Sequence, residues 1–98
     1  MRTIALTLIA LAISSSTFAS TELAKSKNCL TCHTIDKKTV GPAFKDVAKK
    51  YSEADQAKLV SRVLAGTKGN WGAIPMPPNK ITEAEANELV TWILKQKG

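Results

Sequence analysis

The sequence predicts a small all-α domain of about four short helices. Apolar residues recur at helical spacing in three separate stretches, so each stretch has one face suited to burial. Two of these stretches begin with the residue pattern of a capping box, which marks the start of a helix. The alternation of strands and helices that is typical of a thioredoxin-like fold is absent.

Residues 1–19 are expected to be a secretory signal peptide. Arg2 precedes an apolar run over residues 4–13, and Thr17-Phe18-Ala19 puts small residues where a signal peptidase cuts. The alternative is an uncleaved membrane anchor, but the run is shorter than the roughly 20 residues that a membrane-spanning helix needs. Cleavage after Ala19 would leave residues 20–98 as one domain, located in the periplasm of a Gram-negative host.

Residues 20–98 are few for a protein held together by a hydrophobic core alone. The full chain carries a net charge of +6. Domains of this size are marginal without a further source of buried apolar volume. A bound apolar group is therefore expected in the core, because only four aromatic side chains remain: Phe44, Tyr51, Trp71 and Trp92.

The first helix of the domain is predicted from Thr21 to about Asn28. Thr21 is a suitable N-cap, and Glu22 places a negative charge in the first turn, where it is favourable. Leu23 and Ala24 give the helix a modest apolar face. The helix leads directly into a cysteine motif, which is therefore expected at a helix end.

That motif, Cys29-Leu30-Thr31-Cys32-His33, has the spacing of a c-type haem attachment site. Each cysteine sulfur of such a site adds to one vinyl group of the porphyrin, and the adjacent histidine can supply an axial nitrogen to the iron. Cys-x-x-Cys pairs also occur in redox-active disulfides and in zinc sites, so the motif alone leaves those alternatives open.

A polar loop over residues 34–40 is expected to lead into Gly41-Pro42. Pro42 lacks an N–H, but a ligating histidine usually donates its second ring N–H to such a carbonyl. The same dipeptide also suits a plain turn with Pro42 at the first helical position. The two roles are compatible.

Two helices are predicted in the middle of the domain. The first covers residues 43–50, where apolar residues recur at i, i+3 and i+4. The second begins at the capping-box pattern Ser52-Glu53-Ala54-Asp55, continues to about Ala65 and is stopped by Gly66. Arg62 on this second helix is either a solvated charge or the partner of a buried anion such as a haem propionate.

The stretch over residues 66–81 is predicted to be neither helix nor strand. It contains three glycines, and Pro75, Pro77 and Pro78 stiffen the backbone around Met76. A lone methionine often fills a gap in a core. Here a metal ligand is favoured, because Met76 and His33 are the only residues of their kinds after the signal peptide. If the cysteine motif holds a haem, the alternatives are that Lys80 ligates the iron in place of Met76, or that the sixth coordination position of the iron is vacant.

The last helix is predicted from Thr82 to about Lys97. Thr82-Glu83-Ala84-Glu85 forms a full capping box, and the lysines near the end suit the helix dipole. Trp92 lies on the flank of the apolar stripe and is expected to be a core or helix-contact residue.

These motifs together resemble the small bacterial class I cytochromes c of the cytochrome c-551/c-552 type. The resemblance extends from about Thr21 to Lys97. It rests on the cysteine motif, on residues 40–48 (Val-Gly-Pro-Ala-Phe-Lys-Asp-Val-Ala), on residues 71–79 (Trp-Gly-Ala-Ile-Pro-Met-Pro-Pro-Asn) and on the closing helix with Trp92.

The resemblance implies an all-α fold around one covalently bound haem c, with the first and last helices crossing. It implies axial ligation by His33 and Met76, and thioether bonds from Cys29 and Cys32. It also implies that Pro42 accepts a hydrogen bond from His33, that Asn79 hydrogen-bonds near the Met76 sulfur, and that Arg62 and Trp71 bind a propionate. Ala24 departs from the family, whose members often carry a larger residue at the helix crossing. If space exists there, Ala24→Phe is expected to raise the melting temperature.

Ligation by histidine and methionine would fill both axial positions of the iron. The expected function is therefore a soluble periplasmic one-electron carrier cycling between Fe(II) and Fe(III), and not an enzyme. Lysines in the half of the chain that holds the cysteine motif would steer it to redox proteins with acidic docking surfaces, although they also serve solubility. The resemblance implies a nitrite reductase, terminal oxidase, peroxidase or quinol-oxidising cytochrome complex as partner. Nucleic-acid binding is not expected of an exported chain with few aromatic residues, and the carrier is expected to be a monomer.

Two other classes of protein remain as alternatives. In the first, Met76 leaves the iron easily, which would give peroxidase-like or ligand-binding activity. The second holds no haem and uses Cys29 and Cys32 for thiol–disulfide exchange, which the missing strand-and-helix alternation disfavours.

Overall fold

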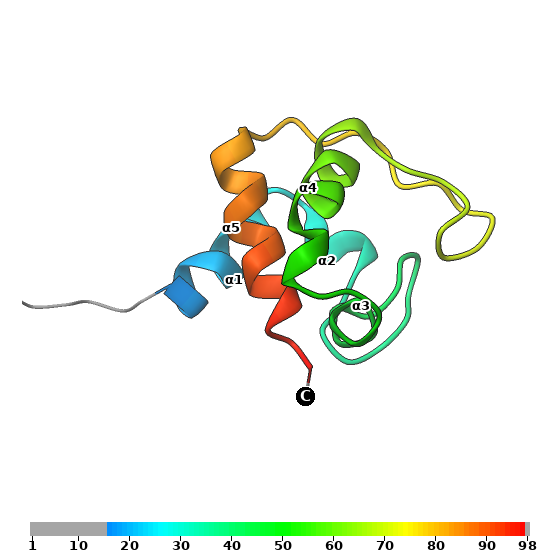
Figure 1. Ribbon diagram of the computed structural model, residues 1–98, viewed down its shortest axis with the longest axis horizontal. Helices are drawn as coiled ribbons and strands as arrows, with labels where there is room; N and C mark the ends of the chain where they lie inside the picture. The colour runs from blue at the N-terminus through cyan, green and yellow to red at the C-terminus, as the bar shows by residue number, and fades with distance from the viewer. Residues whose placement is uncertain (1–15, 98) are drawn as a thin grey trace, which may run out of the picture.

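Helices make up most of the part of the chain that the computed structural model describes, residues 16–97 (Figure 1). No strand is formed within that range, which confirms the all-α prediction. The predicted signal peptide falls largely outside it, since residues 1–15 are not described. The elements are α1 (Ser16–Ser26), α2 (Cys29–Cys32), α3 (Phe44–Lys50), the 3-10 turn η1 (Glu53–Asp55), α4 (Gln56–Ala65) and α5 (Glu83–Leu94).

The first helix differs from its prediction at both ends. α1 begins at Ser16, so Thr21 lies inside the helix and is not its N-cap. The helix continues towards the N-terminus because the residues before Thr21 are compatible with a helical backbone. The suitability of Thr21 as an N-cap does not stop the helix there. It ends at Ser26, where the chain turns through Asn28 in a left-handed conformation with φ 64°.

The last helix, α5, begins where its capping box predicts. The Thr82 side chain accepts from the Glu85 N–H at 3.1 Å, and the Glu85 carboxylate accepts from the Thr82 N–H at 2.9 Å. The predicted end near Lys97 is wrong, because α5 stops at Leu94. Leu94 is the last buried residue of the apolar stripe, so no packing holds a further turn.

α5 is the helix against which the others pack, and it divides the core in two. Trp92, expected to be a core residue, is 4% exposed. Beside α4 the buried residues are Leu59, Val60, Val63, Ala86, Val90 and Leu94. Beside α1 and α3 they are Ala24, Phe44, Leu89 and Trp92.

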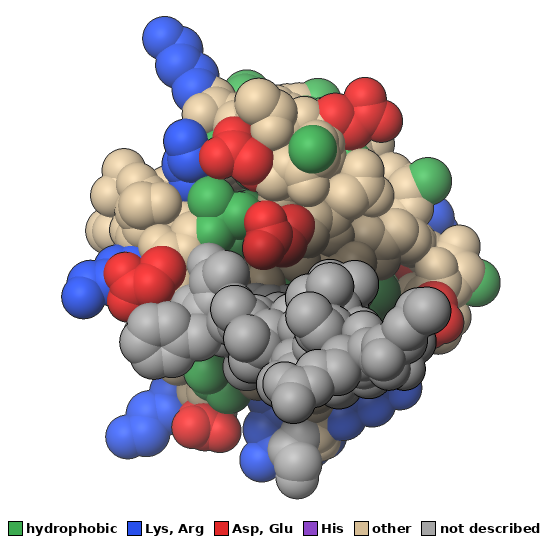
Figure 2. All heavy atoms as spheres, turned by 90° about the vertical axis from the view of Figure 1, so that its left-hand side faces the viewer, with side chains coloured by type: hydrophobic (Ala, Val, Ile, Leu, Met, Phe, Trp, Pro, Cys, Tyr) green, Lys and Arg blue, Asp and Glu red, His purple; other side chains and the backbone are tan. Residues whose placement is uncertain are grey.

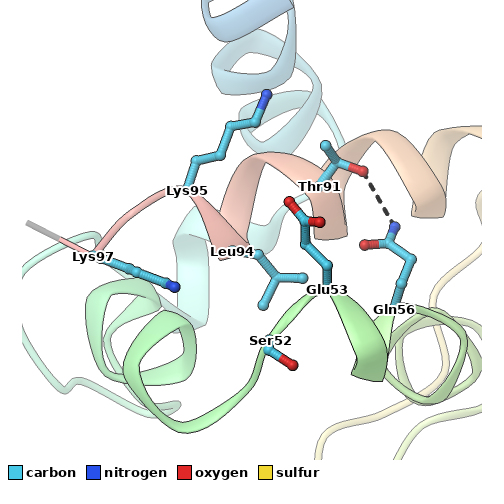
Figure 3. A pocket seen from close by; sticks show the side chains of 7 residues that line it. All are labelled: Ser52, Glu53, Gln56, Thr91, Leu94, Lys95 and Lys97. Carbon is cyan, nitrogen blue, oxygen red and sulfur yellow. Dashed lines mark hydrogen bonds between the residues drawn. The ribbon is translucent and has the colours of Figure 1, made fainter.

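The start of α4 is joined to α5 by polar contacts at the surface. Gln56 Nε2 donates to Thr91 Oγ1 at 3.2 Å (Figure 3). It also donates to the Asn87 carbonyl at 3.1 Å. The predicted capping box of Ser52 and Asp55 is present, but it opens η1 rather than α4 itself. α4 ends at Ala65 and Gly66 is its C-cap, as predicted.

Candidate functional site

The two cysteines lie on α2, a single helical turn. Residues three apart on a helix are neighbours on one face, so Cys29 and Cys32 present their sulfurs side by side. Burial raises the pKa of the Cys29 thiol above its ordinary value. The left-handed turn at Asn28 separates α2 from α1 and sets the direction of this face.

The His33 ring is fixed in one tautomer by the residue that the sequence singled out. His33 Nδ1 lies 2.8 Å from the Pro42 carbonyl oxygen. A carbonyl oxygen only accepts hydrogen bonds, so Nδ1 carries the proton and donates it. In the neutral ring Nε2 then keeps its lone pair, which is the arrangement that a metal-ligating imidazole requires.

The His33 ring is closely approached by Phe44 and by the Gly41 backbone. The Phe44 ring stacks on it with a centroid distance of 4.9 Å and an interplanar angle of 21°. Gly41 covers it so closely that a Cβ there would lie 2.7 Å from His33 Nδ1 and 2.9 Å from Nε2. The sequence assigned a role to Pro42 but none to Gly41, because the need for glycine at position 41 comes from a contact with a residue eight positions away.

The backbone around His33 is tied to α3. The first N–H groups of α3 donate to carbonyls of the preceding loop, Phe44 to Thr34 at 2.9 Å and Lys45 to Ile35 at 3.0 Å. These bonds satisfy donors that a helix start leaves unpaired. They also place the loop after His33 against the helix that carries Phe44.

Met76 lies at one end of a closed loop. Its N–H donates to the Thr67 carbonyl at 2.7 Å, and its carbonyl accepts from the Thr67 N–H at 3.0 Å. Gly66, just before Thr67, has φ +81°, and a Cβ there would lie 2.7 Å from the Met76 carbonyl oxygen. Residues 67–76, called the Met76 loop below, therefore close only with glycine at position 66.

Asn79 anchors the chain that follows the Met76 loop to α4. Its side-chain Nδ2 donates to the Val63 carbonyl at 3.0 Å, and its backbone N–H donates to the same oxygen at 3.2 Å. Val63 lies in the last turn of α4, where carbonyls lack helical partners. Nδ2 also contacts the Pro77 carbonyl at 3.3 Å.

Arg62 and Trp71 are linked through Tyr51. Arg62 Nη1 donates to the Tyr51 hydroxyl at 2.9 Å, and the Trp71 ring meets the Tyr51 ring edge-on with centroids 6.4 Å apart. Partial burial would raise the pKa of the Tyr51 phenol, but the hydrogen bond from Arg62 and the charges of Arg62 and Lys50 outweigh it and lower that pKa. The sequence did not single out Tyr51 or Lys50 for the site.

Every residue that the sequence predicted for the site lines a single cavity of about 330 Å³. Leu89, Val90 and Ile93 of α5 contribute to its wall, which is largely apolar. The cavity presents two thiols, an imidazole with an available Nε2 and a thioether. This set fits a porphyrin that is attached through two sulfurs. The eight predicted residues are Cys29, Cys32, His33, Pro42, Arg62, Trp71, Met76 and Asn79.

Within residues 16–97, no three or more His, Cys, Asp or Glu side chains gather in a way that could hold a metal ion. None of the helices in that range has the length and apolar character to cross a membrane.

Comparison with known proteins gives a consistent result. The family model described as Cytochrome c matches residues 20–97. Cytochrome c-552 of Hydrogenobacter thermophilus is 48% identical over 83 residues, covering 83% of this chain and 85% of the relative. Cytochrome c-551 of Azotobacter vinelandii is 52% identical over 80 residues, covering 78% of this chain and 95% of the relative.

A solved structure agrees in fold as well as in sequence. The crystal structure of wild-type Nitrosomonas europaea cytochrome c552 superposes with a TM-score of 0.74 at 44% identity. The match covers 76% of this chain and 96% of that one.

Proposed function

The chain belongs to the cytochrome c family, and from this premise we propose that it is a periplasmic one-electron carrier whose haem iron is held by His33 and Met76. The family carries a covalently attached haem c and transfers electrons rather than catalysing a reaction. What the proposal adds is the assignment of ligands, compartment and docking surface to residues of this chain.

The observation that carries the ligand assignment is the state of His33. Its Nδ1 proton is committed to Pro42, so Nε2 is the nitrogen available to a metal on the same cavity that Met76 lines. Met76 also lies on this cavity, on a loop whose closure is set by its own backbone bonds to Thr67. The iron of the bound haem supplies the Fe(II)/Fe(III) couple.

The remaining residues bind and orient. Cys29 and Cys32 would form the two thioether bonds from one face of α2. Arg62 brings a positive charge to the cavity wall, where it suits a propionate, and Trp71 lies next to it across Tyr51. With His33 and Met76 both bound, the iron would keep no open position for a substrate, which agrees with a carrier rather than an enzyme.

The docking surface is proposed at the mouth of the cavity. Val40, Trp71 and Ile74 line the cavity and are also among the exposed large hydrophobic residues, with Ile74 65% exposed. By contrast, the side of the molecule that carries α1 shows interspersed acidic and basic side chains with isolated hydrophobic ones (Figure 2). An apolar centre with Lys68 on the same cavity and Lys50 over the Trp71 ring suits brief contact with an acidic redox partner.

The first experiment is an optical spectrum of the protein matured with c-type haem machinery. A sharp low-spin reduced spectrum, together with a weak far-red band in the oxidised protein, is expected for His33 and Met76 ligation. A Met76→Ala variant should lose the far-red band and keep the covalent haem. A wild-type protein without the band would contradict the ligand assignment.

The compartment is tested by mass spectrometry of protein from the periplasmic fraction of a Gram-negative host. A chain that begins at Ser20 is expected from cleavage after Ala19. Recovery of the full-length chain with the membranes would contradict the periplasmic assignment and favour the uncleaved anchor.

A further inference from the structure

Lys50 makes contacts that an ordinary surface lysine does not. It is the last residue of α3, and its Nζ lies 4.7 Å from the centroid of the Trp71 ring and 5.4 Å from that of Tyr51. The same nitrogen lies 3.4 Å from the Asn70 carbonyl oxygen. Trp71 and Asn70 both belong to the Met76 loop, so one ammonium group joins α3 to two adjacent residues of that loop.

We propose that Lys50 is a positioning residue that latches the Met76 loop shut by lying against the Trp71 ring and the Asn70 carbonyl. A lysine ammonium within about 6 Å of an indole centroid is attracted by the negative face of the ring. The Asn70 carbonyl offers the same ammonium an acceptor from the next residue along the loop. Both contacts are lost when the loop swings away from α3.

The latch is backed by a second cation on the other side of Tyr51. The Arg62 guanidinium carbon lies 5.5 Å from the Tyr51 centroid, and Nη1 donates to the Tyr51 hydroxyl. Tyr51 is thereby held between α4 and Lys50, and its ring meets Trp71 edge-on at 67°. The aromatic pair that receives Lys50 is therefore itself fixed to the helices.

Among the described residues, two other side-chain contacts hold the loop tip: the Trp71 ring meets Tyr51, and Asn70 Nδ2 donates to Thr67 Oγ1 within the loop. Its two ends meet at the Thr67–Met76 bridge, but Gly69 and Gly72 have open space where a side chain would be. Glycines with positive φ in open space allow the backbone to move at low cost. Lys50 would therefore govern how often the loop opens and Met76 withdraws from the cavity.

The test compares Lys50→Gln with Lys49→Gln in the holoprotein. Lys49 is the preceding residue, is exposed on α3 and carries the same charge, so it controls for charge removal. The first measurement is native-state exchange of the Thr67 and Met76 amide hydrogens, which form the bridge at the base of the loop. Lys50→Gln should speed their exchange about two- to fivefold, the loss expected for one exposed cation–π contact.

A second measurement follows the rate at which imidazole binds the ferric protein. Imidazole can reach the iron only after Met76 withdraws, so Lys50→Gln should raise this rate by a similar factor. Lys50→Arg should restore both rates, since a guanidinium also stacks on indole.

Two outcomes would overturn the latch. One is equal exchange at Thr67 and Met76 in Lys50→Gln and Lys49→Gln. The other is an equal acceleration at the buried α5 residues Leu89 and Val90, which would indicate a loss of global stability. The inference rests on the proposed Met76 ligation, but amide exchange does not depend on it. Absence of the far-red band in the wild-type protein would therefore contradict the proposed function. The amide exchange rates of Thr67 and Met76 would still test the latch.

Discussion

The two sides of the cavity are built in different ways. The His33 side belongs to the core, since its ring stacks on Phe44, and Phe44 in turn meets the buried Trp92 edge-on at 5.5 Å. The Met76 side is a loop that is closed by backbone bonds to Thr67 and covered by surface contacts. We therefore expect His33 to be displaced only when the protein unfolds. Met76, in contrast, is expected to leave the cavity without unfolding of the protein.

The largest predicted effect is on the His33 side. In Gly41→Ala the new methyl group would overlap the His33 ring, whose position is held by stacking on Phe44 and by the hydrogen bond to the Pro42 carbonyl. We expect a loss of about 3 kcal/mol of stability, at the upper end for overpacking, and a displaced ring. Thermal unfolding and the optical spectrum measure both. A variant with the wild-type spectrum and melting temperature would show that the residues around His33 can shift to accommodate the methyl group.

The next effect tests how full the core behind His33 is. Ala24 is completely buried against Phe44, Leu89 and Trp92, so the space that would let a larger residue stabilise the helix crossing is taken up. Ala24→Phe should cost about 2 kcal/mol and lower the melting temperature by roughly 10 °C. A rise would reveal unfilled space at the crossing of α1 and α5.

A smaller and local effect is expected on the Met76 side. Gly66 has φ +81° and ψ 168°, a region that only glycine adopts easily, so Gly66→Ala should cost about 1–2 kcal/mol. The far-red band should then disappear at a lower temperature than the helices unfold by circular dichroism. Gly69→Ala is the matched control, because Gly69 shares the positive φ but has no atom near its missing Cβ. Equal effects of the two variants would remove the close approach to Met76 as the cause.

The smallest effect concerns α5, on which both sides rest. The Thr82 N–H and, at 3.6 Å, Lys27 hold the pKa of Glu85 below its ordinary value. A carboxyl whose pKa is lowered by folding stabilises the fold above its unfolded pKa, and that contribution is lost as pH falls through the folded pKa. Glu85→Gln should therefore narrow the difference in melting temperature between neutral and acidic pH. Glu88→Gln, exposed on the same helix, should not.

The sequence predicted those parts of the site that depend on residue type and local spacing. The cysteine pair, His33 and Met76 follow from chemistry that few other residues can supply, and both capping boxes follow from side chains three residues apart. Gly41 and Lys50 could not be found this way, because their roles come from contacts with residues 8 and 21 positions away in the chain. The predicted start of α1 at Thr21 was wrong, and the helix begins at Ser16. Helix propensity changes little across residues 16–21, so it does not mark the boundary.

The position of the proposed cleavage site within α1 has an electrostatic consequence. The helix runs from Ser16, so removal of residues 1–19 would shorten it and place a new α-amino group at Ser20. That positive charge would face the positive end of the helix dipole, an unfavourable pairing. Glu22 would then fall in the first turn of the shortened helix, where its carboxylate offsets the amino group. Maturation would thus place a surface glutamate where its charge stabilises the first turn of the first helix.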